Sequence, residues 1–110
     1  MAEYTMRETD GTVFLTISGE LILNTHSQLK DEIKAHLSGK KRVIVDLSGV
    51  PFIDSSGLGM LISWFKSVNE ADGRIVFASL NPYVRKIIKI SKLDKIFLLA
   101  DTPTEAQELL

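Results

Sequence analysis

Cysteine is absent from this chain of 110 residues, and only three prolines are present. The first absence excludes disulfides, thiolate nucleophiles and cysteine zinc sites, and it agrees with a reducing cytoplasm. Because 45% of the residues are apolar and proline is scarce, we expect one packed domain over 1–110. No run approaches the ~20 apolar residues of a membrane helix, and no secretory signal opens the chain. We therefore expect a cytoplasmic protein without a membrane attachment.

An excess of either charge is also missing, since 13 basic residues stand against 14 acidic ones and the net charge is −1. Such a balance provides no general attraction to nucleic acid or to anionic lipid. One predicted helix does carry a basic set, Arg85, Lys86, Lys89 and Lys92. No aromatic platform accompanies it, so a charged solvent face accounts for it. We expect a protein or a small ligand as the partner, and no nucleic acid.

Hydrophobic periodicity predicts the first elements of the fold. Two stretches of alternating apolar residues flank Asp10-Gly11, a pattern typical of a β-hairpin with a tight turn. Helical spacing then predicts a helix that is capped by Asn24 or Thr25 and ends near Leu37. The near-continuous apolar run over 43–47 is typical of a buried central strand.

The second half of the chain alternates helices and strands. The first predicted elements are a helix opened by Asp54-Ser55-Ser56-Gly57 and a strand over 74–78. The next is a helix opened by Asn81-Pro82, with an apolar face of Val84, Ile87, Ile88 and Ile90. A strand over 96–99 and a short helix opened by Thr102-Pro103-Thr104-Glu105 complete the chain. The resulting order is β-β-α-β-α-β-α-β-α. It predicts a single α/β domain with a mixed β-sheet and helices packed on it.

The helix that begins at 54–57 carries two different faces. At about 100° per residue, its predicted core face consists of Leu58, Leu61, Ile62, Phe65 and Val68, with Trp64 at the edge. The opposite side is rich in small residues, which permit close approach of another backbone, and it holds one adaptable apolar side chain. These residues are Ser56, Gly59, Met60, Ser63 and Ser67. We expect either ordinary solvent exposure or a docking surface there.

A serine at the start of this helix is a candidate switch. Backbone N–H groups lack intrahelical partners at a helix start and the macrodipole is positive there, so a phosphate on Ser55 is favoured. An ordinary N-cap role for the Ser55 hydroxyl, worth about 1 kcal/mol, is compatible with phosphorylation. Because ligands favour the carboxyl ends of parallel strands, we expect 54–59 to lie at a functional edge of the sheet.

The sequence motifs typical of catalytic and cofactor-binding sites are incomplete in this chain. Ser55 lacks the G-x-S-x-G elbow, and His26 and His36 have neither an evident catalytic partner nor the spacing of a metal motif. The glycines of 57–59 follow a strand, but Ile62 replaces the third glycine of a dinucleotide motif and no Walker lysine follows. We expect no enzyme activity, no cofactor and no metal.

The segment Asp54-Ser55-Ser56-Gly57-Leu58-Gly59, preceded by the run over 43–47 and by Gly19-Glu20-Leu21, resembles the bacterial anti-anti-sigma factors of the STAS family. The resemblance spans essentially the whole chain. It implies that the unphosphorylated protein binds an anti-sigma factor, commonly a serine kinase, and thereby releases a sigma factor. It also implies that the kinase phosphorylates Ser55 and ends the binding, and that a PP2C-type phosphatase reverses the modification.

By the same resemblance, the second serine of the motif serves local hydrogen bonding, and Asp54 positions the hydroxyl or the kinase. Together with the small-residue face, this predicts a partner-binding set of Asp54, Ser56, Gly57, Gly59, Met60 and Ser63. Many relatives carry an aspartate where this chain has Ile22, which leaves the cognate anti-sigma factor open. The alternative is a STAS scaffold in a stress-signalling assembly or in a membrane lipid-transport system. A monomer is expected, with the oligomeric state otherwise open.

Overall fold

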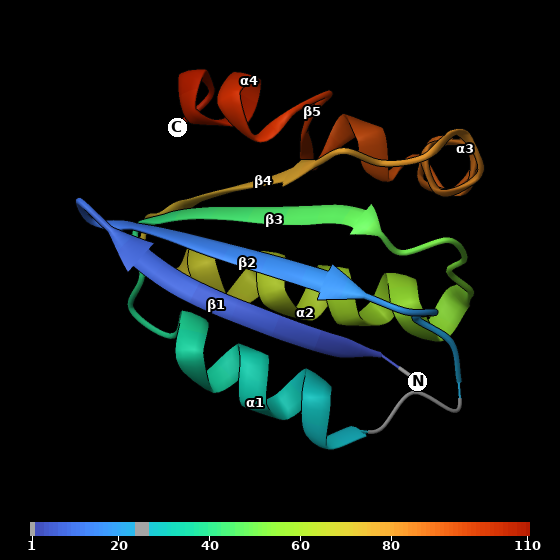
Figure 1. Ribbon diagram of the computed structural model, residues 1–110, viewed down its shortest axis with the longest axis horizontal. Helices are drawn as coiled ribbons and strands as arrows, with labels where there is room; N and C mark the ends of the chain where they lie inside the picture. The colour runs from blue at the N-terminus through green and yellow to red at the C-terminus, as the bar shows by residue number, and fades with distance from the viewer. Residues whose placement is uncertain (1, 24–26) are drawn as a thin grey trace.

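A five-stranded sheet organises the chain, of which the computed structural model describes residues 2–23 and 27–110 (Figure 1). The strands are β1 (Glu3–Thr9), β2 (Thr12–Ser18), β3 (Arg42–Gly49), β4 (Arg74–Ala78) and β5 (Leu98–Ala100), and they lie in the order β1-β2-β3-β4-β5. β1 runs antiparallel to β2, whereas β2, β3, β4 and β5 are parallel. The predicted mixed sheet is confirmed. So is the hairpin, whose turn residues Asp10 and Gly11 both have positive φ.

The helices follow the strands in the predicted alternation. They are α1 (Ser27–Leu37), α2 (Ser55–Glu70), α3 (Pro82–Ile90) and α4 (Pro103–Glu108), with a short 3₁₀ helix, η1 (Leu93–Lys95), before β5. Figure 1 shows α1 and α2 on one face of the sheet and α4 on the opposite face. Within the described ranges, none of the helices combines the length and the apolarity needed to cross a bilayer.

The sheet separates two apolar clusters. Alternate residues such as Leu15, Val45 and Phe77 face the larger cluster, together with the apolar sides of α1, α2 and α3. Their neighbours Ile44 and Val76 point the other way and pack near α4. Because β3 is buried on both faces, its near-continuous apolar run is explained, and the prediction of a central strand is confirmed.

Side chains cap two of the later helices as predicted. The Asn81 side-chain oxygen accepts a hydrogen bond from the Val84 amide at 2.8 Å, and the Thr102 hydroxyl accepts one from the Glu105 amide at 3.0 Å. The predicted caps of α1, Asn24 and Thr25, lie outside the described residues.

Two predictions about the C-terminal third are wrong. The last strand was expected over 96–99, but it begins at Leu98, because the Phe97 amide donates to the Leu93 carbonyl at 2.7 Å and the chain turns through η1 first. Ile90 was expected on the apolar face of α3, but 65% of its surface is exposed. α3 ends there, and its buried contacts come from Val84 and Ile88.

The buried face of α2 is also rotated from the predicted one. Trp64 is fully buried and its indole N–H donates to the Lys30 carbonyl of α1 at 3.2 Å. Met60 is only 6% exposed, so its predicted place on the outer side is wrong, while Ile62 and Phe65 are half-buried at the edge. The physical reason is that α2 packs against α1 as well as against the sheet, which a single helical wheel does not reveal.

Candidate functional site

Ser55 lies at the edge of the sheet where the parallel strands end. It is the first residue of α2 and its side chain is exposed. In Figure 1 the arrowheads of β2 and β3 point to the end of the molecule where α2 begins. The predicted position of the motif at the carboxyl ends of the strands is confirmed.

Asp54, and not Ser55, caps α2. One carboxylate oxygen of Asp54, Oδ1, accepts hydrogen bonds from the backbone amides of Ser56 at 2.9 Å and Gly57 at 3.1 Å. These are two of the amides that a helix start leaves without intrahelical partners. The N-cap interpretation of Ser55 is therefore wrong. The reason is that Asp54 has the extended backbone of a cap residue, with φ −111° and ψ −171°, while Ser55 is already helical.

The other carboxylate oxygen of Asp54 reaches a different loop. Oδ2 accepts a hydrogen bond from the Leu23 amide at 2.9 Å, so one side chain joins the loop after β2 to the start of α2. Partial burial works to raise the pKa of Asp54, but the amides of Gly57, Leu23 and Ser56 outweigh it and hold that pKa below its ordinary value. The carboxylate is therefore charged and structurally engaged beside Ser55.

Backbone bonds strengthen the same junction. The Leu21 amide donates to the Phe52 carbonyl and the Asp54 amide donates to the Leu21 carbonyl, both at 3.1 Å. Leu21 and Ile53 thereby form a short parallel bridge beyond the ends of β2 and β3. The loop after β2 and the loop before α2 are thus held together at the edge that carries Ser55.

Gly57 lies beneath this junction and is buried. A Cβ at this position would overlap the Leu21 carbonyl oxygen and would lie 2.9 Å from the Leu21 Cβ. The glycine therefore permits close packing of α2 against the loop, and the prediction that it faces a partner is wrong. Met60 is removed from that set for the burial described above.

Ser56, Gly59 and Ser63, which were predicted for both the outer side of α2 and the partner-binding set, lie beside Ser55, and Ser67 farther along the helix is half-buried. Ser55 and Gly59 are exposed, Ser56 and Ser63 are half-buried, and a Cβ on Gly59 would meet no atom of the described residues within 4 Å. We call Ser55, Ser56, Gly59 and Ser63 the α2 outer face. Its small side chains leave the helix backbone accessible near Ser55.

Exposed apolar side chains that the sequence patterns missed lie near this edge. Leu23 is 75% exposed, Tyr83 42% and Phe52 38%. The rings of Phe52 and Tyr83 stack, with centroids 5.1 Å apart and an interplanar angle of 18°. Phe52 comes two residues before the motif over 54–59, but exposure of an apolar residue in a loop leaves no periodic signal in a sequence.

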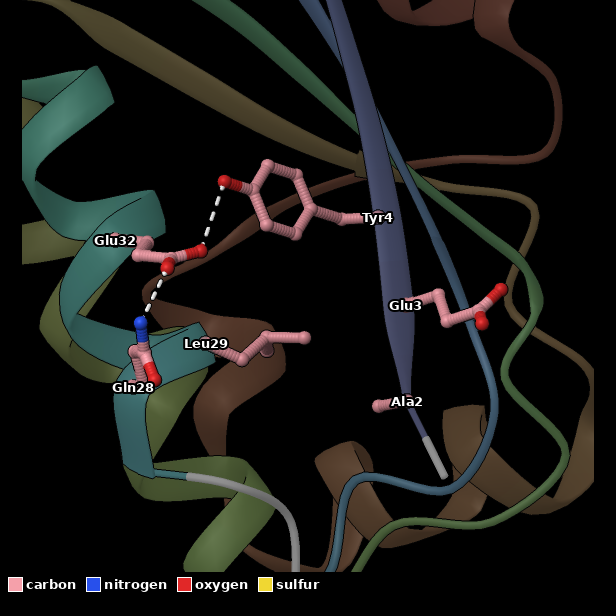
Figure 2. A pocket seen from close by; sticks show the side chains of 6 residues that line it. All are labelled: Ala2, Glu3, Tyr4, Gln28, Leu29 and Glu32. Carbon is pink, nitrogen blue, oxygen red and sulfur yellow. Dashed lines mark hydrogen bonds between the residues drawn. The ribbon is translucent and has the colours of Figure 1, made fainter.

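A separate groove of about 340 Å³ opens between β1 and α1. Figure 2 shows the Tyr4 hydroxyl and the Gln28 amide both directed at Glu32, with donor–acceptor distances of 3.2 Å and 2.9 Å. Burial and the Glu32 carboxylate raise the pKa of Tyr4. The Glu3 side chain, by contrast, points away from α1. The groove contains none of the residues predicted for the site.

The histidines do not join the Ser55 edge. His36 lies in the last turn of α1, with its ring centroid 6.4 Å from that of Tyr4, and His26 lies outside the described residues. Over 2–23 and 27–110, no three His, Cys, Asp or Glu side chains gather as metal ligands would.

The mixed sheet, its helices and the exposed serine that follows the Asp54 cap define a small α/β module. The profile of the STAS domain family matches residues 3–106, and the chain belongs to that family. The family resemblance seen in the motif over 54–59 is thereby confirmed.

Three known proteins illustrate the relationship. The anti-sigma F factor antagonist of Paenibacillus polymyxa is 26% identical over 98 residues, covering 87% of this chain and 84% of that protein. The crystal structure of an anti-sigma factor antagonist from Mycobacterium paratuberculosis matches with a TM-score of 0.86 at 26% identity, covering 99% of this chain and 93% of that one. Phosphorylated SpoIIAA, a Bacillus cell fate determinant, shares the fold with a TM-score of 0.72 at 24% identity, covering 96% of this chain and 97% of that one.

Proposed function

We propose that this chain is a cytoplasmic anti-sigma factor antagonist whose binding to a kinase-type anti-sigma factor is ended by phosphorylation of Ser55. The single observation that carries the proposal is the exposed serine at the first position of α2, in a chain of the STAS family. The names of its relatives and the phosphorylated form of SpoIIAA, which has the same fold, support it. A PP2C-type phosphatase would restore the binding form.

Asp54 determines what a phosphate on Ser55 can do. The amides of Ser56 and Gly57, which a phosphate at a bare helix start would bind, are already occupied by the Asp54 carboxylate. The added charge of about −1.5 to −2 would therefore stand beside an ionised carboxylate and project outward. A partner docked on the α2 outer face would then have to accept that charge at a surface shaped for a neutral hydroxyl, with repulsion and desolvation both opposing it.

Purified components test this proposal. Each kinase-type anti-sigma factor of the source organism is incubated with the chain, ATP and Mg²⁺, and mass spectrometry locates the phosphate. We expect it on Ser55. A phosphate on Ser56, or none with any of these kinases, would contradict the assignment.

Calorimetry then compares the affinities of the variants. Ser55→Ala should bind as the unmodified chain does, whereas Ser55→Asp and the phosphorylated chain should bind at least about tenfold more weakly. Ser91→Asp is the matched control, because it adds the same charge at an exposed residue that follows α3, at that helix's carboxyl end. Equal weakening by both aspartates would indicate a general charge effect and not a switch at Ser55.

A further inference from the structure

Three exposed apolar side chains follow the sheet edge in the order of the strands. Leu23 lies in the loop after β2, Phe52 in the loop after β3, and Tyr83 in the first turn of α3 after β4. Because β2, β3 and β4 are neighbours in the sheet, these residues flank the start of α2 on the same edge as Ser55. Folding alone leaves them without full burial.

The three positions are held rigidly with respect to Ser55. The Leu23 amide is bonded to the Asp54 carboxylate, and Phe52 is two residues before Asp54. The Asn81 side-chain amide donates to the carbonyls of Val50 at 3.3 Å and Pro51 at 3.2 Å, which ties the start of α3 to the loop that carries Phe52. The stacked rings are therefore preorganised, and a partner would lose little side-chain entropy by binding them.

We propose that Phe52 and Tyr83, assisted by Leu23, form the apolar anchor that holds the anti-sigma factor beside Ser55. The inference rests on the proposed function. In that function Ser55 switches the affinity for the anti-sigma factor, and the anchor residues supply this affinity. Exposed, rigid aromatic side chains near the centre of a contact surface are the side chains that dominate binding energy in protein interfaces. The α2 outer face has small side chains and offers little apolar area of its own.

Continuity with the Ser55 edge points to the protein partner as the occupant, because Phe52 is two residues before Asp54 and the Leu23 amide is bonded to the Asp54 carboxylate. Charge at this edge is mixed and does not favour an anionic lipid surface. Asp54 and the exposed Glu20 are acidic, whereas α3, which carries Tyr83, also bears Arg85, Lys86 and Lys89. A protein can place an apolar pocket over the rings while it leaves the carboxylates at a wet rim.

The anchor is tested by measuring how tightly variants of this chain bind the purified anti-sigma factor that the wild-type chain binds. Phe52→Ala and Tyr83→Ala should each weaken binding by about tenfold or more, while Tyr83→Phe, which keeps the ring, should stay within about twofold. Ile96→Ala is the matched control. It removes an apolar side chain that is 56% exposed between η1 and β5 and that is not part of the proposed anchor. Circular dichroism and thermal melts verify that each variant is folded.

The outcomes separate the anchor from the switch. If Phe52→Ala and Tyr83→Ala bind as tightly as the wild type while Ser55→Asp binds weakly, the proposed anchor is wrong and the proposed switch at Ser55 is retained. If the wild type binds none of the anti-sigma factors, both are wrong. If light scattering shows that the ring substitutions dissolve a dimer and leave anti-sigma binding unchanged, the occupant is a second copy of this chain and the inference is overturned.

Discussion

The carboxylate of Asp54 accepts a hydrogen bond from the backbone amide of Leu23 at 2.9 Å, across 31 residues of sequence. The same carboxylate caps α2 through its other oxygen. One side chain thus couples the geometry of a helix start to that of a neighbouring loop. Ser55, the proposed phosphorylation site, is the next residue, so the charge and position of its surroundings depend on Asp54.

Replacement of Asp54 by alanine should lower the free energy of unfolding by about 2 kcal/mol, because three backbone amides lose their acceptor. Urea denaturation measures the loss. The exposed Asp31 on α1 provides the control, and Asp31→Ala should change the free energy by less than about 0.5 kcal/mol. Equal stability of the two variants would contradict the structural role of Asp54.

The lowered pKa of Asp54 predicts a pH dependence of stability. In the unfolded chain the carboxyl titrates near its ordinary value of 3.8, and in the folded chain it titrates below that value. The unfolded state therefore takes up the proton first as the pH falls. The ionised Asp54 carboxylate therefore contributes fully to the free energy of unfolding above the pKa of the unfolded chain. This contribution is lost as the pH drops through the pKa of the folded chain.

The wild type and Asp54→Asn should accordingly differ most in unfolding free energy at neutral pH, and the difference should shrink in acid. Urea titrations at a series of pH values measure it. A difference that stayed constant down to the most acid condition would show that the ionised form of Asp54 contributes nothing.

Two glycines of α2 should respond in opposite ways to alanine. Gly57→Ala should cost about 1–3 kcal/mol, since the added Cβ overlaps the Leu21 carbonyl. Gly59→Ala should stabilise the fold by about 0.5–1 kcal/mol, because the space around it is open and alanine is the better helix former. Thermal or urea unfolding of both variants checks the sign of each change.

Met60→Glu and Gly59→Arg should separate the core side of α2 from its outer side. The glutamate would place a charge where the side chain is only 6% exposed, so we expect a loss of about 3 kcal/mol or more. The arginine projects from the exposed side and should leave the fold intact while it weakens anti-sigma binding. A stable Met60→Glu variant with an unchanged melting temperature would contradict the observed packing.

Much of the architecture was predictable from local patterns. The Asp10-Gly11 turn, the caps Asn81 and Thr102, and the central strand each depend on residues close together in the chain, where turn chemistry and periodicity are strong signals. The boundary of β5 was not predictable. The backbone of Phe97 is used by the turn through η1, and an apolar run does not distinguish that use from a strand.

The functional site was likewise predictable from the sequence only in part. The motif over 54–59 indicated its location and its serine, but it did not distinguish Asp54 from Ser55 as the cap. That choice depends on the backbone angles at the corner and on the Leu23 amide, which comes from another loop. The apolar trio at the edge was missed because only the folded arrangement decides which loop side chains stay uncovered.

By itself, the sequence determined the order of the elements, the class of sheet and the serine at a helix start, because these follow from propensities and spacings within a few residues. On α2, Leu58, Leu61 and Val68 are buried as the helical spacing predicts, but the tertiary structure decided the limits of the buried side, where Gly57, Met60 and Trp64 are also covered. α1 covers Trp64, and the loop after β2 presses against Gly57, so the burial of each residue depends on neighbours that are distant in the chain. Contacts of that kind arise only when the elements pack, and they determine what surface remains for a partner.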